Sequence, residues 1–520
     1  MAKKHVPYHK KKRHKVAKLF SRTTLIILAF LAQVVLLGFA LYYMARYFYT
    51  YFLITYIISL LLIIVILFKN QEQTYKIAWI VTIVIIPVIG TLIYLFVQLD
   101  YYPRLLKKHY LRNTEKMHGY LENKDDNLEE LGKIDSRYKG VASYLQNIHE
   151  FPTYRPEALE YYPSGEASLD DILSSLRSAE KFINIEFFII KDGIFWKKVI
   201  DILVEKAEQG VEVRFLYDGL NEMFNVPRNL PRRLKKVGIE ARVFSPTKSS
   251  SPHRENYRNH RKSIVVDGKV AFVGGINLAD EYINEEERFG YWKDAVLRVE
   301  GEAVNAITLM FFTMWNLREK EDFDCTKYLR EENENYLEDS FVIPYGDSPF
   351  LKDIISYNIY LEIINKATKY VYICSPYLVL TREFTNALVY ASRRGVDVRL
   401  LMPGIPDKKI PFLVARTYYK QLINAGIKIY EYTKGFNHSK LFVSDDIVFT
   451  VGSTNLDYRS FFLSFENGVL GINKDIALDI KEDLLKAYKE SQLIDLETYK
   501  KFSKWSRFWG QIFRIFIPLL

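Results

Sequence analysis

Cysteine is nearly absent from this chain, which has two in 520 residues. So few thiols exclude a disulfide framework and a cysteine-rich metal module. The N-terminus also lacks the short apolar run and small-residue cleavage site of a secretory signal peptide. Charge is abundant: 72 Lys and Arg against 62 Asp and Glu give a net charge of +10, which favours an anionic partner such as nucleic acid, phosphate or anionic lipid. The length predicts two or three structural units.

Long apolar runs are confined to the N-terminal hundred residues. The runs near 24–43 and 50–68 are each long enough to span a bilayer, whose core takes about 20 apolar residues. A third run, 76–99, contains Pro87 and Gly90, which could kink it or make it re-entrant. We therefore expect two or three transmembrane helices.

The charges that flank these runs give conflicting signals on orientation. Nine Lys and Arg within residues 1–22 place the N-terminus in the cytoplasm. Three full spans would then put the rest of the chain outside. The basic segment 104–116, directly after the third run, argues for the inside. The sequence leaves the face open.

The rest of the chain contains an internal repeat with an offset near 180 residues. Each copy begins with a helical pattern and a β-branched run. A second helix follows, closed by glycine (Gly210, Gly395), and leads into a V-x-V-R-x-L strand. Alternating helices and strands predict α/β layers around a largely buried sheet. The period is too long for a solenoid and suits two duplicated domains.

Each copy carries the same chemical motif, His-x-Lys-x4-Asp. A glycine follows fourteen residues after the histidine (Gly274, Gly452) and an asparagine seventeen after it. Two such matches in register make coincidence very improbable. The candidate residues are His260, Lys262, Asp267 and Asn277 in the first copy, and His438, Lys440, Asp445 and Asn455 in the second.

The run from His to Asp is apolar and β-branched, which predicts a strand with His and Lys on one face. Two half-sites facing each other across a pseudo-twofold axis would gather two imidazoles, two ammonium groups and two amides. These groups would repel a metal cation and suit a phosphate diester. One imidazole can attack phosphorus while the other protonates the leaving oxygen.

Carboxylates are expected to orient the imidazoles. Asp267 and Asp445 have the opposite strand parity from His and Lys, so a structural role is favoured for them. Asp294 and Glu466 are the better candidates for accepting a hydrogen bond from imidazole Nδ1. The alternative for these two is a simple surface carboxylate.

The paired motifs, with GGIN and GSTN after them, resemble the phospholipase D superfamily. The segment IVIIPVIGTLIYL, both motif blocks and the IFIPLL ending look like the bacterial cardiolipin synthase family, over about residues 50–520. This resemblance implies that the His, Lys and Asp of both motifs are catalytic and that Asn277 and Asn455 contact phosphate. It also implies a phosphatidyl transfer between two phosphatidylglycerols, giving cardiolipin and glycerol, with the first-half histidine as nucleophile and no metal or cofactor.

Other readings use the same residues. They are a phospholipase D or phosphatidylserine synthase, with water or serine as acceptor, and a nuclease. A membrane scaffold that binds anionic lipid without turnover is a reading of another class, and two intact catalytic sets weigh against it. The membrane segments weigh against nucleic acid as partner. We expect a multi-pass protein of a bacterial plasma membrane that binds phosphatidylglycerol and other anionic lipids, with its oligomeric state left open. The third apolar run and the basic tail depart from the two membrane segments usual in the resembled family.

The expected fold is α/β, with transmembrane helices before two pseudo-twofold-related phospholipase D-like domains packed together. The C-terminal segment KKFSKWSRFWGQIFRIFIPLL sets basic residues (Lys501, Lys504, Arg507, Arg514) beside an aromatic face, which is typical of an interfacial membrane helix or of a helix docked on the protein core. The predicted segments are a basic cytoplasmic tail (1–22), a transmembrane region (23–98), a juxtamembrane linker (99–135), the two domains (136–330 and 331–500) and an amphipathic helix (501–520).

Overall fold

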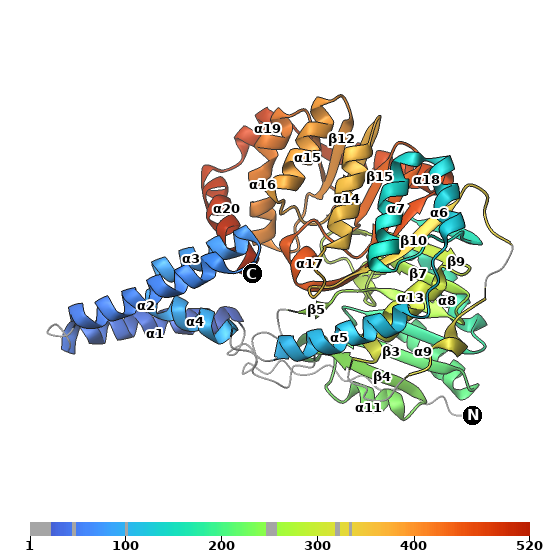
Figure 1. Ribbon diagram of the computed structural model, residues 1–520, viewed down its shortest axis with the longest axis horizontal. Coiled ribbons are helices and arrows are strands. Elements are labelled where there is room, and N and C mark those ends of the chain that lie inside the picture. Colours follow the sequence, from blue (N-terminus) through green and yellow to red (C-terminus); the bar gives the residue numbers. More distant parts are fainter. Residues whose placement is uncertain are drawn as a thin grey trace.

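The computed structural model describes residues 22–43, 48–98, 102–245, 257–317, 323–331 and 335–519 (Figure 1). The predicted basic tail lies outside the described residues except for Arg22. Figure 1 shows two α/β halves stacked on each other, with a group of N-terminal helices projecting from one side.

The N-terminal helices are four in the described part of the chain: α1 (Arg22–Tyr43), α2 (Phe48–Phe68), α3 (Gln73–Ile85) and α4 (Pro87–Gln98). Within the side chains that the structure describes, which leave out parts of α1 and the start of α2, no helix is both long enough and apolar enough to cross a bilayer.

The third apolar run forms a helical hairpin. Proline at position 87 ends one helix and begins the next, since it cannot supply the N–H that a continuous helix needs. The rings of Trp79 and Tyr94 lie 5.2 Å apart across the hairpin. A Cβ on Gly90 would come within 2.8 Å of the Thr82 carbonyl oxygen, so the close approach requires glycine. Its helices have 13 and 12 residues, about 20 Å each, too short to span singly.

The first half is built on a seven-stranded sheet with the order β1-β9-β7-β6-β2-β3-β4. Its strands are β1 (Ala158–Tyr162), β2 (Phe182–Phe187), β3 (Glu212–Asp218), β4 (Ile239–Phe244), β6 (Ser263–Val266), β7 (Val270–Gly274) and β9 (Val296–Glu300). Its helices are α8 (Gly165–Ser178), α9 (Ile194–Glu208), α10 (Asn221–Phe224), α11 (Leu230–Lys235) and η2 (Asp280–Ile283).

The second half repeats this order as β10-β17-β16-β15-β11-β12-β13, and β18 is added at the far edge. The strands are β10 (Phe341–Asp347), β11 (Tyr370–Cys374), β12 (Asp397–Pro403), β13 (Lys428–Tyr432), β15 (Leu441–Ser444), β16 (Val448–Gly452), β17 (Ser464–Ile472) and β18 (Ser491–Ile494). The helices are α14 (Ile355–Lys366), α15 (Arg382–Arg393), α16 (Lys409–Asn424), α17 (Tyr458–Phe462), α18 (Lys474–Lys489), α19 (Leu496–Lys501), α20 (Lys504–Phe516) and η4 (Ile517–Leu519). The duplicated α/β fold predicted from the repeat is confirmed.

The glycines that mark the repeat do what their positions predict. Gly210 and Gly395 follow α9 and α15 with φ angles of +92° and +97°. This left-handed conformation ends a helix and strains any residue with a Cβ. The chain then enters the parallel strands β3 and β12, whose side chains are largely buried.

The segment expected as a linker contains two helices and leads into a third. They are α5 (Tyr102–His118), α6 (Asp125–Ile134) and α7 (Ser136–His149). Tyr110 and Met117 of α5 belong to the main hydrophobic core, together with every apolar residue of the fully buried α13 (Val304–Trp315). This segment therefore covers the core, and its apolar side chains are spaced at helical intervals that the high charge obscured.

Candidate active site

Each motif histidine is held by a backbone exchange between the two halves. The short strand β5 (Arg258–Asn259) of the first half pairs with β17, and β14 (Gly435–Asn437) pairs with β8 (Tyr291–Lys293) of the first half. The backbone N–H of His260 then donates to the Phe465 carbonyl (2.9 Å), and that of His438 to the Lys293 carbonyl (2.7 Å). Both histidines therefore lie on the seam between the halves.

The exchange changes one local prediction. His and Lys of each motif come before the regular strands β6 and β15. The motif residues lie where the chain leaves the short strand that pairs with the other half (β5 or β14) and joins the sheet of its own half (β6 or β15). The strand predicted from His to Asp thus begins three residues later than the sequence pattern indicates.

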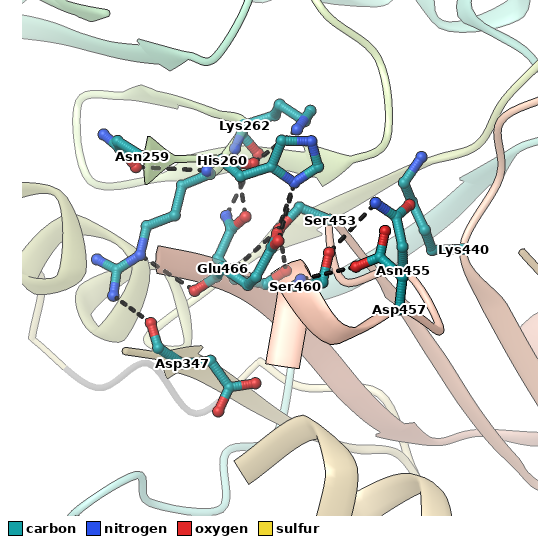
Figure 2. A network of polar contacts seen from close by, with 12 residues as sticks. Asn259, His260, Lys262, Asp347, Lys440, Ser453, Asn455, Asp457, Ser460 and Glu466 are labelled. Atoms are coloured by element: carbon teal, nitrogen blue, oxygen red, sulfur yellow. Dashed lines mark hydrogen bonds and ion pairs between the residues drawn. The ribbon is translucent and has the colours of Figure 1, made fainter. Parts of the chain in front are cut away.

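The carboxylates that contact the imidazoles are exchanged as well. Both oxygens of Glu466 lie near His260 Nδ1, at 2.8 and 3.0 Å, and Asp294 Oδ2 lies 2.6 Å from His438 Nδ1. Figure 2 shows the first of these pairs. Asp294 belongs to the first half and Glu466 to the second, so each carboxylate binds the histidine of the other half. An Nδ1–H held in this way leaves the Nε2 lone pair available for a reacting atom.

The two lysines lie beside their own histidines in matching positions. Lys262 Nζ donates to the His260 carbonyl oxygen (2.6 Å), and Lys440 Nζ donates to the His438 carbonyl oxygen. Both lysines are buried, at 1% and 3% exposure. Two buried ammonium groups beside two imidazoles make a site that favours an anion.

Burial governs the protonation of these groups. It lowers the pKa of Lys262 to about 7 and that of Lys440 to about 8. Burial, together with the charge of Lys440, lowers the pKa of His438 to about 4, and burial with the charges of both lysines holds the pKa of His260 well below its usual value. Both imidazoles are thus neutral at pH 7 in the free site. A bound phosphate anion would favour the protonated forms of lysine and histidine.

The two carboxylates differ in electrostatic character. Burial would raise the pKa of Asp294, but the charges of His438 and Lys440 outweigh it and lower that pKa. For Glu466 burial prevails over the nearby charge of Lys262, and its pKa is raised well above the usual value. The similar half-sites are therefore not electrostatically equivalent.

The motif aspartates lie at the far end of their strands. Asp267 and Asp445 occupy the β6–β7 and β15–β16 turns, with φ angles of +54° and +56°. The Asp267 carboxylate accepts hydrogen bonds from the backbone N–H groups of residues 180–182, each at 2.8 Å, at the start of β2. Asp445 does the same for residues 368–370 at the start of β11 and binds Arg137. The geometry gives both aspartates a strand-anchoring position, as their parity indicates, and the active-site role that the family resemblance implies for them stays a prediction.

This position predicts a stability defect for Asp445→Asn with little change in turnover. The pKa of Asp445 is about 2 in the folded protein, below its unfolded value, so the carboxylate stabilises the fold above about pH 4 and this contribution is lost as the pH falls toward 2. We expect a loss of about 1 kcal/mol at pH 7, after allowance for solvent screening. Urea unfolding at pH 7 and pH 3 should show a smaller difference between variant and wild type at pH 3. A large loss of turnover with unchanged stability would indicate a catalytic aspartate.

The two asparagines expected to contact phosphate lie in matching positions and are partly engaged. Asn277 Nδ2 donates to the Tyr282 hydroxyl (2.7 Å) and its Oδ1 accepts from the backbone N–H of Ile189 (2.9 Å). Asn455 Nδ2 lies 3.2 Å from the Ser460 hydroxyl of α17. An amide has two N–H groups, so each asparagine keeps one donor for a ligand.

Glycine at the repeated motif positions is explained by close backbone approach. A Cβ on Gly274 would lie 2.2 Å from the Ala295 carbonyl oxygen, and one on Gly452 would lie 2.6 Å from the Asn467 carbonyl oxygen. The next residue differs between the halves. Ser453 Oγ donates to Glu466 (2.5 Å), whereas Gly275 leaves room for Asp294.

Gly275→Ala should therefore disable the His438 half of the site. The added Cβ would lie 1.9 Å from Asp294 Oδ1, so the carboxylate must shift from the position in which its Oδ2 contacts His438 Nδ1. We expect turnover to fall by about 10²-fold or more, as for a disturbed catalytic acid–base group. The control is Ser453→Gly at the matching position of the other half, which removes the hydrogen bonds of the Ser453 hydroxyl with Glu466 and Asn467 and opens space instead of filling it. Turnover of Gly275→Ala within threefold of wild type would contradict this role for the Asp294 contact.

A second layer of buried polar residues escaped the sequence analysis. The asparagine before His260 donates from Nδ2 to Glu186 Oε1 (2.6 Å), and its backbone N–H donates to Asp218 Oδ2 (3.0 Å). Arg261, 1% exposed, donates to the carbonyls of Glu466 and Met310 at 3.1 and 3.0 Å. An asparagine directly precedes each motif histidine, at positions 259 and 437, and this repeated residue is the sequence feature that could have indicated the second layer.

The arrangement defines a class of enzyme that exchanges the alcohol group of a phosphate diester. The reaction site lies at the seam of a duplicated α/β fold. The described residues contain no group of three or more His, Cys, Asp or Glu placed to hold a metal ion.

Comparison with known proteins extends this conclusion. Residues 172–304 and 360–487 match the family described as cardiolipin synthase, PLD-like domain, and residues 57–98 match a phospholipase D-nuclease N-terminal region. The chain therefore belongs to the cardiolipin synthase family of the phospholipase D superfamily.

Individual relatives cover most of the chain. A cardiolipin synthase of Halalkalibacterium halodurans is 32% identical over 88% of this chain and 91% of its own length. An uncharacterized protein of Streptococcus mutans is 41% identical over 87% of this chain and 98% of its own. The crystal structure of phosphatidylserine synthase from Haemophilus influenzae has the same fold, with a TM-score of 0.56, 14% identity and coverage of 73% of this chain and all of its own.

Proposed function

We propose that this protein is a cardiolipin synthase that transfers the phosphatidyl group of one phosphatidylglycerol to another. The observation that carries the proposal is the pair of histidines held by exchanged carboxylates, beside two buried lysines. The family to which the chain belongs and the relatives described as cardiolipin synthases support the choice of substrate.

In the first step the Nε2 of His260 attacks phosphorus and forms an N–P bond. The bond from phosphorus to the glycerol oxygen breaks, and His438, protonated once the diester is bound, gives its proton to that oxygen. Lys262 and Lys440 offset the charge on the phosphoryl oxygens, and the free N–H groups of Asn277 and Asn455 supply further donors. Free glycerol leaves, and His260 carries the phosphatidyl group.

In the second step the neutral His438 accepts the proton of a hydroxyl on a second phosphatidylglycerol. That oxygen attacks phosphorus, the N–P bond breaks, and cardiolipin forms. One diester replaces another, so the exchange is nearly balanced in free energy and reversible. Exclusion of water from the His260 intermediate decides between cardiolipin and phosphatidic acid.

The experiment is a lipid analysis in a host that lacks its own synthase. We expect cardiolipin to appear only with this gene, and the purified protein to release one glycerol for each cardiolipin. Phosphatidic acid without cardiolipin would indicate a phospholipase D. Serine-dependent phosphatidylserine would indicate a phosphatidylserine synthase. Phospholipids unchanged by the gene, with DNA cleaved by the protein, would indicate a nuclease.

We further propose that the N-terminal helices are embedded in the plasma membrane. The bounds of α1 and α2 correspond to about 33 and 31 Å, close to the thickness of a hydrocarbon core. Large apolar side chains cover the outside of α2, among them Phe52 and Leu61, which are 55% and 59% exposed. With α3 and α4 forming a hairpin, two spans would leave the catalytic halves on the cytoplasmic face.

This topology can be tested with single cysteines, because both native cysteines are buried. Thr50→Cys lies near the start of α2 and Lys236→Cys lies on the first catalytic half, and both positions are exposed. In intact spheroplasts a membrane-impermeant maleimide should label the first variant only. Labelling of Lys236→Cys in intact spheroplasts would place the catalytic halves outside.

A further inference from the structure

The C-terminal helix α20 is docked on the second half by one face. A Cβ on Gly510 would lie 2.6 Å from the Leu413 carbonyl oxygen of α16, so the helices approach closely. The guanidinium of Arg514 lies 4.0 Å from the centre of the Tyr418 ring, and that of Arg507 lies 5.5 Å from the Tyr499 ring. Two members of the predicted basic stripe are therefore turned toward the protein.

The opposite face of α20 is aromatic and open. Trp505, Phe508, Trp509 and Ile515 are 71%, 53%, 46% and 36% exposed. The ring centres of residues 505 and 508 are 6.1 Å apart and those of residues 508 and 509 are 5.6 Å apart, so the three aromatic side chains form one surface. Spacings of three and four residues place them on one side of the helix. Trp rings are favoured at the boundary between lipid headgroups and acyl chains.

This aromatic face is continuous with the apolar N-terminal helices. Both α20 and η4 contact α3, and Leu519 packs against the cluster formed by Ile66, Trp79 and Tyr94. Figure 1 shows α20 at the edge of the second half, beside α3. The hairpin next to it exposes further apolar side chains, including Leu92 and Phe96 at 60% and 59%.

A groove with several polar lining residues lies between α15 and α16 and reaches α20 at one residue. It has a volume of about 440 Å³ and is lined by Gln511 of α20, Tyr499, and the side chains of α15 and α16, among them Arg393 and Lys420. Two cations and several amides next to an exposed aromatic face match the two parts of an anionic phospholipid, a phosphate headgroup above an apolar boundary.

We propose that α20 lies in the membrane interface, with its aromatic face at the headgroup–acyl boundary and the groove of Arg393 and Lys420 receiving an anionic lipid phosphate. The N-terminal helices and α20, which contacts α3, together hold this side of the catalytic halves at the bilayer. The seam that carries His260 and His438 is thereby kept at headgroup depth. This deepens the proposed function, since it concerns how the same enzyme meets a lipid substrate.

Tryptophan quenching tests the contact without any need for activity. The full chain is placed in proteoliposomes of phosphatidylglycerol and phosphatidylcholine, with or without phosphatidylcholine brominated near the headgroup end of its acyl chains. We expect brominated lipid to quench wild type more than the variant Trp505→Phe/Trp509→Phe. Equal quenching of the two proteins would overturn the proposal, whether or not the protein makes cardiolipin.

Turnover supplies the second test. The triple variant Trp505→Ser/Phe508→Ser/Trp509→Ser should lose about tenfold in activity on vesicles and less than twofold in detergent micelles, which present lipid without this docking. The matched control is Phe224→Ser, an aromatic residue 69% exposed on the first half. Equal loss in vesicles and micelles would overturn the proposal, as would conversion of a dimer to a monomer by the triple variant, which would assign the face to a second copy.

The groove is tested separately with Arg393→Gln/Lys420→Gln. We expect this variant to need more phosphatidylglycerol in mixed vesicles for half-maximal activity, with its micellar turnover unchanged. The control is Lys236→Gln, which removes one positive charge at an exposed position of the first half. An unchanged dependence on phosphatidylglycerol would remove the groove from the proposal.

Discussion

His260→Ala and His438→Ala should each lower cardiolipin formation by at least about 10³-fold. Each variant loses a group that no neighbour replaces, the nucleophile in one case and the acid–base group in the other. Both imidazoles lie at the seam, with exposed fractions of 13% and 10%, and removal of either side chain leaves the backbone hydrogen bonds of residues 260 and 438 in place. The purified variants should therefore remain folded, with unfolding midpoints close to that of wild type.

The measurement is the initial rate of cardiolipin and glycerol release from phosphatidylglycerol in mixed micelles. Mixing the two inactive variants controls for exchange between chains. Because each site takes residues from both halves of one chain, a mixture of the two variants should stay inactive. Substantial synthesis by either variant alone would contradict a mechanism with two histidines.

Glu466→Gln and Asp294→Asn should produce large but different defects. An amide can turn its NH₂ toward Nδ1 and favour the wrong imidazole tautomer, at a cost of about 10²- to 10⁴-fold in turnover. Glu466 contacts the assigned nucleophile His260, whereas Asp294 contacts the assigned acid His438. On phosphatidylglycerol both variants should be slow.

A lipid with a nitrophenol leaving group separates the two roles, because nitrophenolate leaves without a proton. In rapid-mixing experiments Asp294→Asn should still give a burst of nitrophenol, one per active site. Glu466→Gln should give a burst slowed by about 10²-fold or more. Bursts that are equally slow in both variants would show that the carboxylates do not act on separate steps.

Much of this site could be predicted from local patterns. The repeated spacing from His to Asn reflects a β-hairpin and the loop after it. This hairpin is β6–β7 in the first half and β15–β16 in the second. Strand parity separated Asp267 and Asp445 from the imidazoles, and the structure places each of them in the turn at the far end of β6 or β15. Asp294 and Glu466 follow the motifs further along the chain and are predicted to bind imidazole Nδ1, and their carboxylates lie at those nitrogens.

What could not be predicted depends on contacts between the halves. Nothing local to His260 indicates that its backbone pairs with Phe465 or that its carboxylate comes from the second half. The inward turn of Arg514 also depends on a partner, Tyr418 of α16, distant in sequence. The sequence does not decide whether the run around Pro87 forms a hairpin, because an apolar run is compatible with a single span and with a re-entrant pair of helices.

The central claim is that His260 carries the phosphatidyl group between the two steps. The most direct test is to react the wild-type enzyme with phosphatidylglycerol deuterated in its acyl chains, quench within one turnover, digest it under alkaline conditions that preserve phosphohistidine, and locate the label by mass spectrometry. The account predicts the deuterated adduct on the peptide that contains His260, and its conversion to cardiolipin when unlabelled phosphatidylglycerol is added before the quench. An adduct on the His438 peptide, or cardiolipin formed at the full rate with no adduct on either histidine, would contradict it.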